Sequence, residues 1–367
     1  MDTVVGRKTI REYMTPRERV LSSLRHEVTD RIPLHIKAEK EVWTKLREHF
    51  GVDSDADVMD ALGVDVRTVA PVYVGPEPKR FCDGSYTDVL GFYRQVVSNE
   101  YGSYHEYAGF PLAAAQSVED IESYGWPRPE WWDVSTIPDQ IYRINRNTEY
   151  CILYEAGSVF EMGWGLRGLE EFLMDMVLRP DISQAILSGW AGFWNALNRR
   201  VLEAAGGRID IAWTWDDVGT QSGPMMSPAL WAQQIKPLHV QMNSVLAEYG
   251  AKVMYHSCGG IVRFIEGFID MGVEILNPVQ PRPKGMDLPW IKATYGGRIA
   301  FHGGIDIQET LPHGTAEQVA AEVKDRILTL GRGGGYILAP AHLIQGDTPV
   351  ENIVTMYDTA RSTPVPV

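Results

Sequence analysis

The stretch "KVMYHSCGG" places an imidazole and a thiol, His256 and Cys258, two positions apart at the end of a predicted buried strand. Side chains at positions i and i+2 of a strand point to the same side, so these two can reach one ion together. Zinc accepts thiolate sulfur and imidazole nitrogen in tetrahedral geometry, and a catalytic zinc keeps one position open for a reactant. The spacing therefore predicts a metal site, although a packed histidine beside an inert buried thiol has the same pattern.

Two protein ligands are too few for zinc, so a third has to come from another segment. His342, at the end of the last predicted strand, is the best-placed candidate; its alternative role is a hydrogen bond to a substrate or a backbone carbonyl. Glu161 begins a helix after the third predicted strand, where its carboxylate could face the same site. A glutamate at a helix start is also favoured simply by the helix dipole. We expect His342 or Glu161 to complete the ligand set.

Other candidate residues follow neighbouring predicted strands. Asp216 and Asp217 suggest acid/base work or cation binding, and capping of the next loop is the common alternative. Because they are adjacent on an extended chain, only one of them can face a ligand directly. His302 is a candidate catalytic residue or a packed histidine. The candidates for contact with a substrate are Trp164, Tyr255 and Asn277.

Short apolar segments alternate with helical ones along the whole chain. Strand alternating with helix eight times predicts an α/β fold, the (β/α)8 TIM barrel, in which catalytic groups collect at the carboxyl ends of the strands. A doubly wound open sheet is the rival, but the "GRGGGY" run precedes a strand and gives no dinucleotide fingerprint. The eight predicted strands are 32–36, 64–70, 151–155, 209–215, 252–256, 273–277, 298–302 and 335–339.

We predict one barrel domain over residues 1–367, with an N-terminal helical extension and an irregular β-rich insertion over 75–148. In the extension, a threonine cap and Pro16 at the first helical position mark a helix start. The insertion is rich in Pro, Gly, Trp and Tyr, and its alternations indicate a hairpin followed by a loop without regular period. We expect it to cover one end of the barrel, with aromatic side chains that line a pocket or form a small separate cluster.

Composition narrows the class of partner. The formal charge of −14 argues against nucleic acid or an anionic membrane surface, since both demand a basic face. The N-terminus lacks an apolar signal core, and no uncharged run of about 18 apolar residues occurs, so we expect a cytoplasmic protein. Three cysteines form no disulfide framework. The chain also lacks the G-x-S-x-G elbow of hydrolases and the phosphate-binding G-x-x-x-x-G-K-[ST] loop.

Five segments together resemble the uroporphyrinogen decarboxylase superfamily. They are "MTPRERVLSSLRHEVTDRIPLHI", "WDDVGTQSGPMMSPALWAQQIKPLH", "YHSCGG", "FHGGIDIQETLPHGTAEQVAAEV" and "GGYILAPAHLIQGDTPVENI". The likeness covers nearly the whole chain and implies a (β/α)8 barrel. True decarboxylases carry an arginine pair in an R-Q-A-G-R segment after the first strand, where this chain has "IKAEKEVW". Without that clamp a polyanionic tetrapyrrole is an improbable substrate.

The H-x-C element resembles the corrinoid-dependent methyltransferase branch, in which zinc is held by His, Cys and a further cysteine near the last strand. By that resemblance His256 and Cys258 match ligand positions, and His342 of "APAH" stands where the further cysteine falls. A subgroup with this ending resembles O-demethylase components. The resemblance implies transfer of a methyl group from a methoxylated aromatic to the cobalt of a corrinoid (cobalamin) on a partner protein.

The expected activity is therefore a zinc-dependent methyltransferase with a small methylated donor. The chain contains no D-x-H-x-x-G segment, so we expect the corrinoid to come from a separate protein. Within this class the alternatives are methyl transfer from a methylcorrinoid to a thiol, and a methylamine-type donor held by aromatic and acidic side chains. Outside it they are a metal-free lyase like uroporphyrinogen decarboxylase and a barrel that only binds a corrinoid protein or metal.

Overall fold

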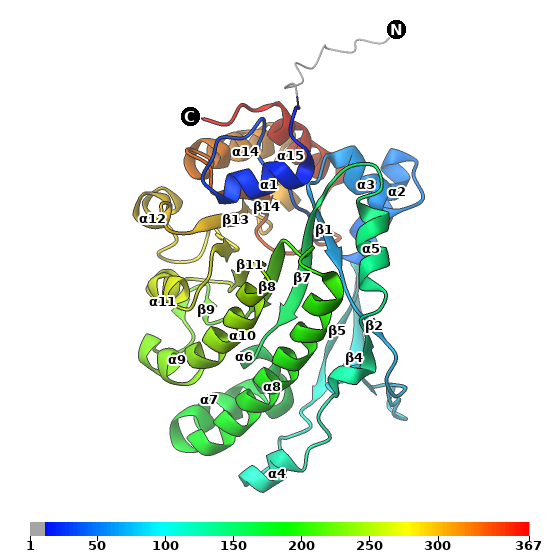
Figure 1. The fold of residues 1–367 in the computed structure, drawn as a ribbon, viewed down its shortest axis with the longest axis vertical. Helices are drawn as coiled ribbons and strands as arrows, with labels where there is room; N and C mark the ends of the chain where they lie inside the picture. Colours follow the sequence, from blue (N-terminus) through cyan, green and yellow to red (C-terminus); the bar gives the residue numbers. More distant parts are fainter. Residues whose placement is uncertain (1–11, 367) are drawn as a thin grey trace. The chain divides into compact units, whose positions relative to one another are not determined.

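The computed structural model describes residues 12–366 and divides the chain into two compact units. The first unit comprises Met1–Arg67, Ile144–Cys151 and Ile275–Val367, and the second comprises Thr68–Arg143 and Ile152–Glu274. The predicted domain over 1–367 also includes residues 1–11 and 367, which lie outside the described part. Figure 1 shows the chain as a ribbon, with labels on many of the helices and strands of both units.

The principal sheet has the strand order β1-β7-β8-β11-β12-β13-β14, which is also their order along the chain. Neighbouring strands such as β8 and β11, or β13 and β14, run parallel. Parallel strands in chain order joined by helices are the topology of a (β/α)8 barrel, so the predicted fold class is confirmed. The strands are β1 (Val66–Val69), β7 (Cys151–Gly157), β8 (Ile211–Trp215), β11 (Lys252–His256), β12 (Ile275–Asn277), β13 (Ala300–Ile305) and β14 (Tyr336–Pro340).

The first predicted strand, 32–36, is reduced to an isolated bridge between Leu34 and Leu338. The backbone N–H of His35 donates to Leu338 O at 3.1 Å, and that of Asp65 donates to Leu34 O at 2.9 Å. This segment therefore lies between β14 and the chain that enters β1, in the place of the eighth strand. Pro33 has no N–H with which to extend the ladder, which accounts for its shortness.

The first helix of the first unit begins as predicted from the sequence. Thr15 caps the first helix in a capping box with Glu18, and Pro16 is its first residue. The helices are α1 (Pro16–Leu24), α2 (Lys40–Phe50), α3 (Asp55–Leu62), α12 (Leu288–Tyr295), α13 (Thr310–His313), α14 (Ala316–Leu330) and α15 (Val350–Ser362).

A buried network of ion pairs fixes the segment 32–36, which we call the closing segment, in the first unit. Asp65 is completely buried; its carboxylate binds the guanidinium of Arg19 at 2.5 Å and that of Arg31 at 2.7 Å. The same carboxylate accepts the backbone N–H of Leu34 at 2.8 Å. Burial raises the pKa of Asp30, but hydrogen bonds from Arg19 and two backbone N–H groups outweigh it and lower this pKa to about 2. The network joins the closing segment to β1 through side chains as well as main chain.

In the second unit, two segments that the sequence presents as single helices are each divided at a proline. Residues 169–206 form α7 (Leu169–Leu178) and α8 (Pro180–Ala205), and residues 227–250 form α9 (Pro228–Gln234) and α10 (Lys236–Glu248). Proline is accepted in the first turn of a helix but not in its interior, so it starts the second helix of each pair. Helices α8 and α10 lie side by side (Figure 1). The remaining helical elements of this part are α6 (Phe160–Arg167), η2 (Val262–Phe264) and α11 (Ile265–Asp270), and the loop after β8 carries β9 (Gly219–Thr220) and β10 (Gly223–Pro224).

The insertion contains the predicted hairpin, formed by β4 (Tyr93–Asn99) and β5 (Gly102–Gly109), with β3 (Tyr86–Thr87) as a third strand. The rest was predicted as a loop without regular period, and that prediction is wrong. It contains β6 (Trp132–Asp133), which pairs with β2 (Val72–Tyr73), and the helical elements α4 (Val118–Glu122), η1 (Pro129–Trp131) and α5 (Ile137–Ile144). Helices of eight residues or fewer make too few turns for their period to show in the sequence.

Within residues 12–366, every helix is too short or too polar to cross a bilayer.

Candidate metal centre

His256 ends β11, and Cys258 follows two residues later on the same side of the chain. The Cys258 sulfur and the His256 Nε2 atom are 3.4 Å apart. Ser257, between them, faces the other way: it is completely buried, and its hydroxyl accepts the backbone N–H of Val218 at 3.0 Å. The alternation that the sequence predicted thus brings a thiol and an imidazole together, and these are donors that zinc prefers. We call them the His256–Cys258 pair.

The two glycines after Cys258 allow a close approach between loops. Gly259 has φ +90°, and a Cβ atom on it would lie 2.5 Å from the carbonyl carbon of Gly219 and 2.6 Å from the nitrogen of Thr220. Gly260 donates its N–H to Thr220 O at 2.9 Å. Only glycine satisfies both the left-handed backbone and the absence of space here. The loop that carries Cys258 is therefore fixed against the loop that follows β8.

Asp217 faces the His256–Cys258 pair. Its Oδ1 atom accepts the backbone N–H of Cys258 at 2.6 Å and lies 3.5 Å from Nε2 of His256. Its side chain is 30% exposed, so this carboxylate is open to a ligand as well as bound to the loop. Of the two adjacent aspartates, Asp217 is the one that can act on a reactant.

Asp216 has a different environment, because it is completely buried and both its carboxylate oxygens are occupied. Its Oδ1 atom accepts the Ser158 hydroxyl at 2.5 Å and the backbone N–H of Glu161 at 2.8 Å. Its Oδ2 atom pairs with Nε2 of His239 at 2.6 Å. Asp216 therefore holds the start of α6 and is placed to position Glu161, which leaves Asp217 as the one of the two aspartates that can face a ligand.

Glu161 is a carboxyl group in an unfavourable environment for its charge. Burial raises its pKa, and the nearby carboxylates of Asp217 and Asp216 raise it further, to about 8. Hydrogen bonds from the Trp215 side chain and the Asp217 backbone oppose this rise. A carboxyl group that is protonated at neutral pH and surrounded by acidic neighbours is the arrangement that a bound cation would relieve.

The raised pKa of Glu161 makes a prediction for the metal-free protein. Between the unfolded pKa of about 4.5 and the folded pKa of about 8, the native state binds more protons, so its stability falls as pH rises. The Glu161→Gln variant lacks this group. We expect it to gain roughly 4 kcal/mol over wild type when the pH is raised from 5 to 9 in chelator. Urea unfolding at the two pH values measures this, with Glu351→Gln on the exposed first turn of α15 as the control. Identical pH profiles for wild type and Glu161→Gln would contradict the assignment.

Trp164 and Tyr255, two residues predicted to contact a substrate, differ in how deeply they are buried. Trp164, on α6, is half-buried and packs against Tyr107 of β5, with ring centroids 5.1 Å apart. Tyr255 is completely buried, with its ring 4.9 Å from His239 and 4.7 Å from Phe268. That core position against α10 and α11 gives no support to a direct contact between Tyr255 and a substrate.

The first unit brings together two other predicted residues and one that the sequence analysis missed. Asn277 Nδ2 lies 2.5 Å from Nδ1 of His302, and Nε2 of His302 lies 2.9 Å from Nδ1 of His35. Burial and the neighbouring His302 hold the pKa of His35 well below its usual value, so His35 is neutral at physiological pH. His342 follows β14 in this unit and is half-buried.

Two of the residues missed from the sequence differ in how they could have been found. His35 is the penultimate residue of the predicted strand 32–36, so it lies near a strand end as His302 does and could have been selected on the same ground. His239 lies within α10, 23 residues from Asp216 along the chain, and no local pattern links the two.

The comparisons agree with this fold. Residues 113–363 match the model of the uroporphyrinogen decarboxylase (URO-D) family, and the chain therefore belongs to that family. Among solved structures, a methyltransferase from Methanosarcina mazei is similar with a TM-score of 0.67 and 17% sequence identity. The similarity covers 95% of this chain and 98% of that one, which supports the barrel fold. No curated protein matches the chain.

Proposed function

We propose that this member of the URO-D family is a zinc-dependent methyltransferase. The proposed donor is a methoxylated aromatic, and the proposed acceptor is the cobalt of a corrinoid on a partner protein. The observation that carries the proposal is the His256–Cys258 pair, with sulfur and nitrogen 3.4 Å apart beside the carboxylate of Asp217. The structural similarity to a methyltransferase and the missing arginine clamp of the decarboxylases both support this choice.

The proposed ligands are His256, Cys258 and His342, a group of residue types that could hold a metal ion together. Imidazole and thiolate donors with one open position are the set expected of a catalytic zinc. Glu161 is the alternative third ligand, because its buried carboxyl group lies among acidic neighbours.

Cleavage of an aryl methyl ether leaves its electron pair on the oxygen, so the site has to stabilise a developing phenolate. A bound zinc ion supplies Lewis acidity for that charge. The chain's own residues hold the ligands in place: Asp217 accepts the Cys258 N–H, and Asp216 fixes the start of α6. Such partners of metal ligands typically change metal affinity about 10- to 100-fold when removed. Asp217 and His302 remain the proposed catalytic groups.

Metal analysis of the purified protein tests the ligand set. We expect about one zinc per chain in wild type and its loss in the His342→Ala variant, because a catalytic zinc needs three protein ligands. His313→Ala, at the end of the short helix α13, is the matched control and should keep the metal. Retention of zinc in His342→Ala together with its loss in Glu161→Gln would assign the third position to Glu161.

Activity is tested by incubating the metal-loaded protein with methoxybenzene and a chemically reduced corrinoid. The expected product is a methylated corrinoid, followed by its absorption spectrum, with phenol released. Full methyl transfer after complete removal of metal would refute the zinc dependence, whereas decarboxylation of a carboxylated ring without metal would indicate a lyase-like enzyme. Tight zinc binding without transfer from any ether, amine or thiol partner would indicate a binding protein.

A further inference from the structure

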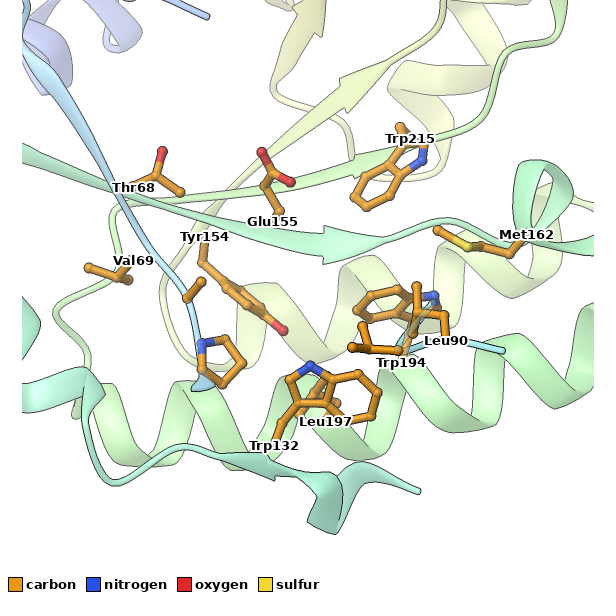
Figure 2. A pocket seen from close by; sticks show the side chains of 13 residues that line it. Thr68, Val69, Leu90, Trp132, Tyr154, Glu155, Met162, Trp194, Leu197 and Trp215 are labelled. Atoms are coloured by element: carbon orange, nitrogen blue, oxygen red, sulfur yellow. The ribbon is translucent and has the colours of Figure 1, made fainter. Parts of the chain in front are cut away.

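The second unit contains an apolar cavity that the proposed metal chemistry does not by itself explain. Its volume is about 390 Å³, a size that suits a small organic molecule. The residues that line it come from the end of β1 and the segment after it, from the strands β7 and β8, from the helices α6 and α8, and from the insertion (Figure 2). The residues used below are Leu90, Trp132, Tyr154, Trp194, Leu197 and Trp215. We call this cavity the aromatic pocket.

The walls of the aromatic pocket are fixed before any ligand arrives. Trp194 lies directly over Gly157, where any Cβ atom would overlap the indole ring, and Gly157 has φ +104°. The Tyr154 hydroxyl donates to Oδ1 of Asn198 at 2.9 Å. Trp132 packs edge-on against Phe193, with ring centroids 5.2 Å apart. A site built from anchored rings loses little entropy when it binds a flat ligand.

The charge of the lining favours an uncharged occupant. The residues that line the aromatic pocket include one carboxylate, Glu155, and neither lysine nor arginine. In Figure 2 the Glu155 side chain leaves β7 on the side opposite to Tyr154, as strand alternation requires. A carboxylate on the ligand would therefore lose its water without gaining a cationic partner, and such burial is costly. Aromatic and leucine side chains instead match the faces and edge of a benzene ring.

Two lining residues connect the aromatic pocket to the candidate metal centre. The Trp215 side chain donates a hydrogen bond to Glu161, and Met162 follows Glu161 in α6. Trp215 also contacts Trp194, with ring centroids 6.2 Å apart. A ring held against Trp215 and Met162 therefore lies beside the segment that carries Glu161.

We propose that the aromatic pocket binds the uncharged ring of a methoxybenzene and excludes rings that carry a carboxylate. Leu90 and Trp132 belong to the insertion, so the insertion contributes to the selectivity for an uncharged ring. The inference rests on the proposed function for the identity of the reacting methoxy group, whereas ring binding itself requires neither zinc nor a corrinoid.

Calorimetric titration of the full chain, without metal or partner, tests the proposal. We expect methoxybenzene to bind at least about tenfold more tightly than 4-methoxybenzoate, because the carboxylate finds no counter-charge. Leu90→Trp should fill the pocket from a half-buried loop position and abolish binding, whereas Leu328→Trp on the exposed face of α14 should leave it unchanged. Leu90→Ala removes one wall contact without crowding the site, so it should weaken methoxybenzene binding only partly, and circular dichroism checks that each variant is folded.

Equal or tighter binding of 4-methoxybenzoate would overturn the proposal, as would unchanged binding in Leu90→Trp. Tighter binding of tetramethylammonium would also overturn it and assign the rings to a cation. Ring binding without methyl transfer would refute the proposed function alone. Methyl transfer that prefers methoxybenzoates would refute the aromatic pocket's role alone.

Discussion

The Cys258→Ser variant should lose zinc and, with it, methyl transfer. A hydroxyl group is not a thiolate donor, so we expect zinc affinity to fall more than about a hundredfold, beyond the loss seen for residues that only support ligands. Transfer from a methoxybenzene should fall at least about a hundredfold, since charge stabilisation at the leaving oxygen is lost. Metal content after dialysis and the rate of corrinoid methylation measure the two effects.

The control for this variant is Cys82→Ser. Cys82 is exposed in the insertion, so the same atom is exchanged without touching the His256–Cys258 pair. Wild-type zinc content and rate in both variants would remove Cys258 from the site. Loss of activity with zinc retained would instead make its thiol a reactant.

Of the single changes where the closing segment meets the start of β1, we expect Asp65→Asn to be the most destabilising. It removes the buried carboxylate partner of Arg31, which then keeps only its pairing with the partly exposed Glu12, and it weakens the pairing of Arg19. Breaking a buried ion pair from one side costs about 3–5 kcal/mol. We expect urea unfolding of the metal-free protein to show a loss of this size, with a clearly lower midpoint.

Glu27→Gln is the matched comparison, because Glu27 pairs with Arg25 at 2.9 Å and both side chains are more than half exposed. An exposed pair is worth about 1 kcal/mol or less. Equal losses in the two variants would show that burial of the Asp65 network does not matter for stability.

The regular part of the barrel could be predicted because buried parallel strands are short apolar runs between amphipathic helices. For β11 the predicted range 252–256 coincides with the strand. The segment 32–36 was recognisable as apolar, but its shortening to a bridge follows from Pro33 and from Asp65, whose side chain replaces part of the ladder. Partners 31 residues apart cannot be paired from local sequence.

The sequence predicted those features of the candidate site that depend on neighbouring residues of one segment. The period of two placed His256 and Cys258 together, and it required that only one of two adjacent aspartates face a ligand. Which one does so depends on Ser158, Glu161 and His239, which reach Asp216 from other elements. From the sequence, only the aromatic side chains of the insertion were expected to line a pocket. The side chains of α8 that also line the aromatic pocket lie far away along the chain, so they could not be predicted.

The close seating of Gly259 on Gly219 and Thr220 also limits how the site can move. The loop that carries Cys258 cannot move without the loop that follows Asp217, because the two backbones are in contact. The Cys258 thiol and the Asp217 carboxylate therefore move as one rigid body. For the proposed methyl transfer, any opening that admits a large reactant would therefore have to come from loops other than these two.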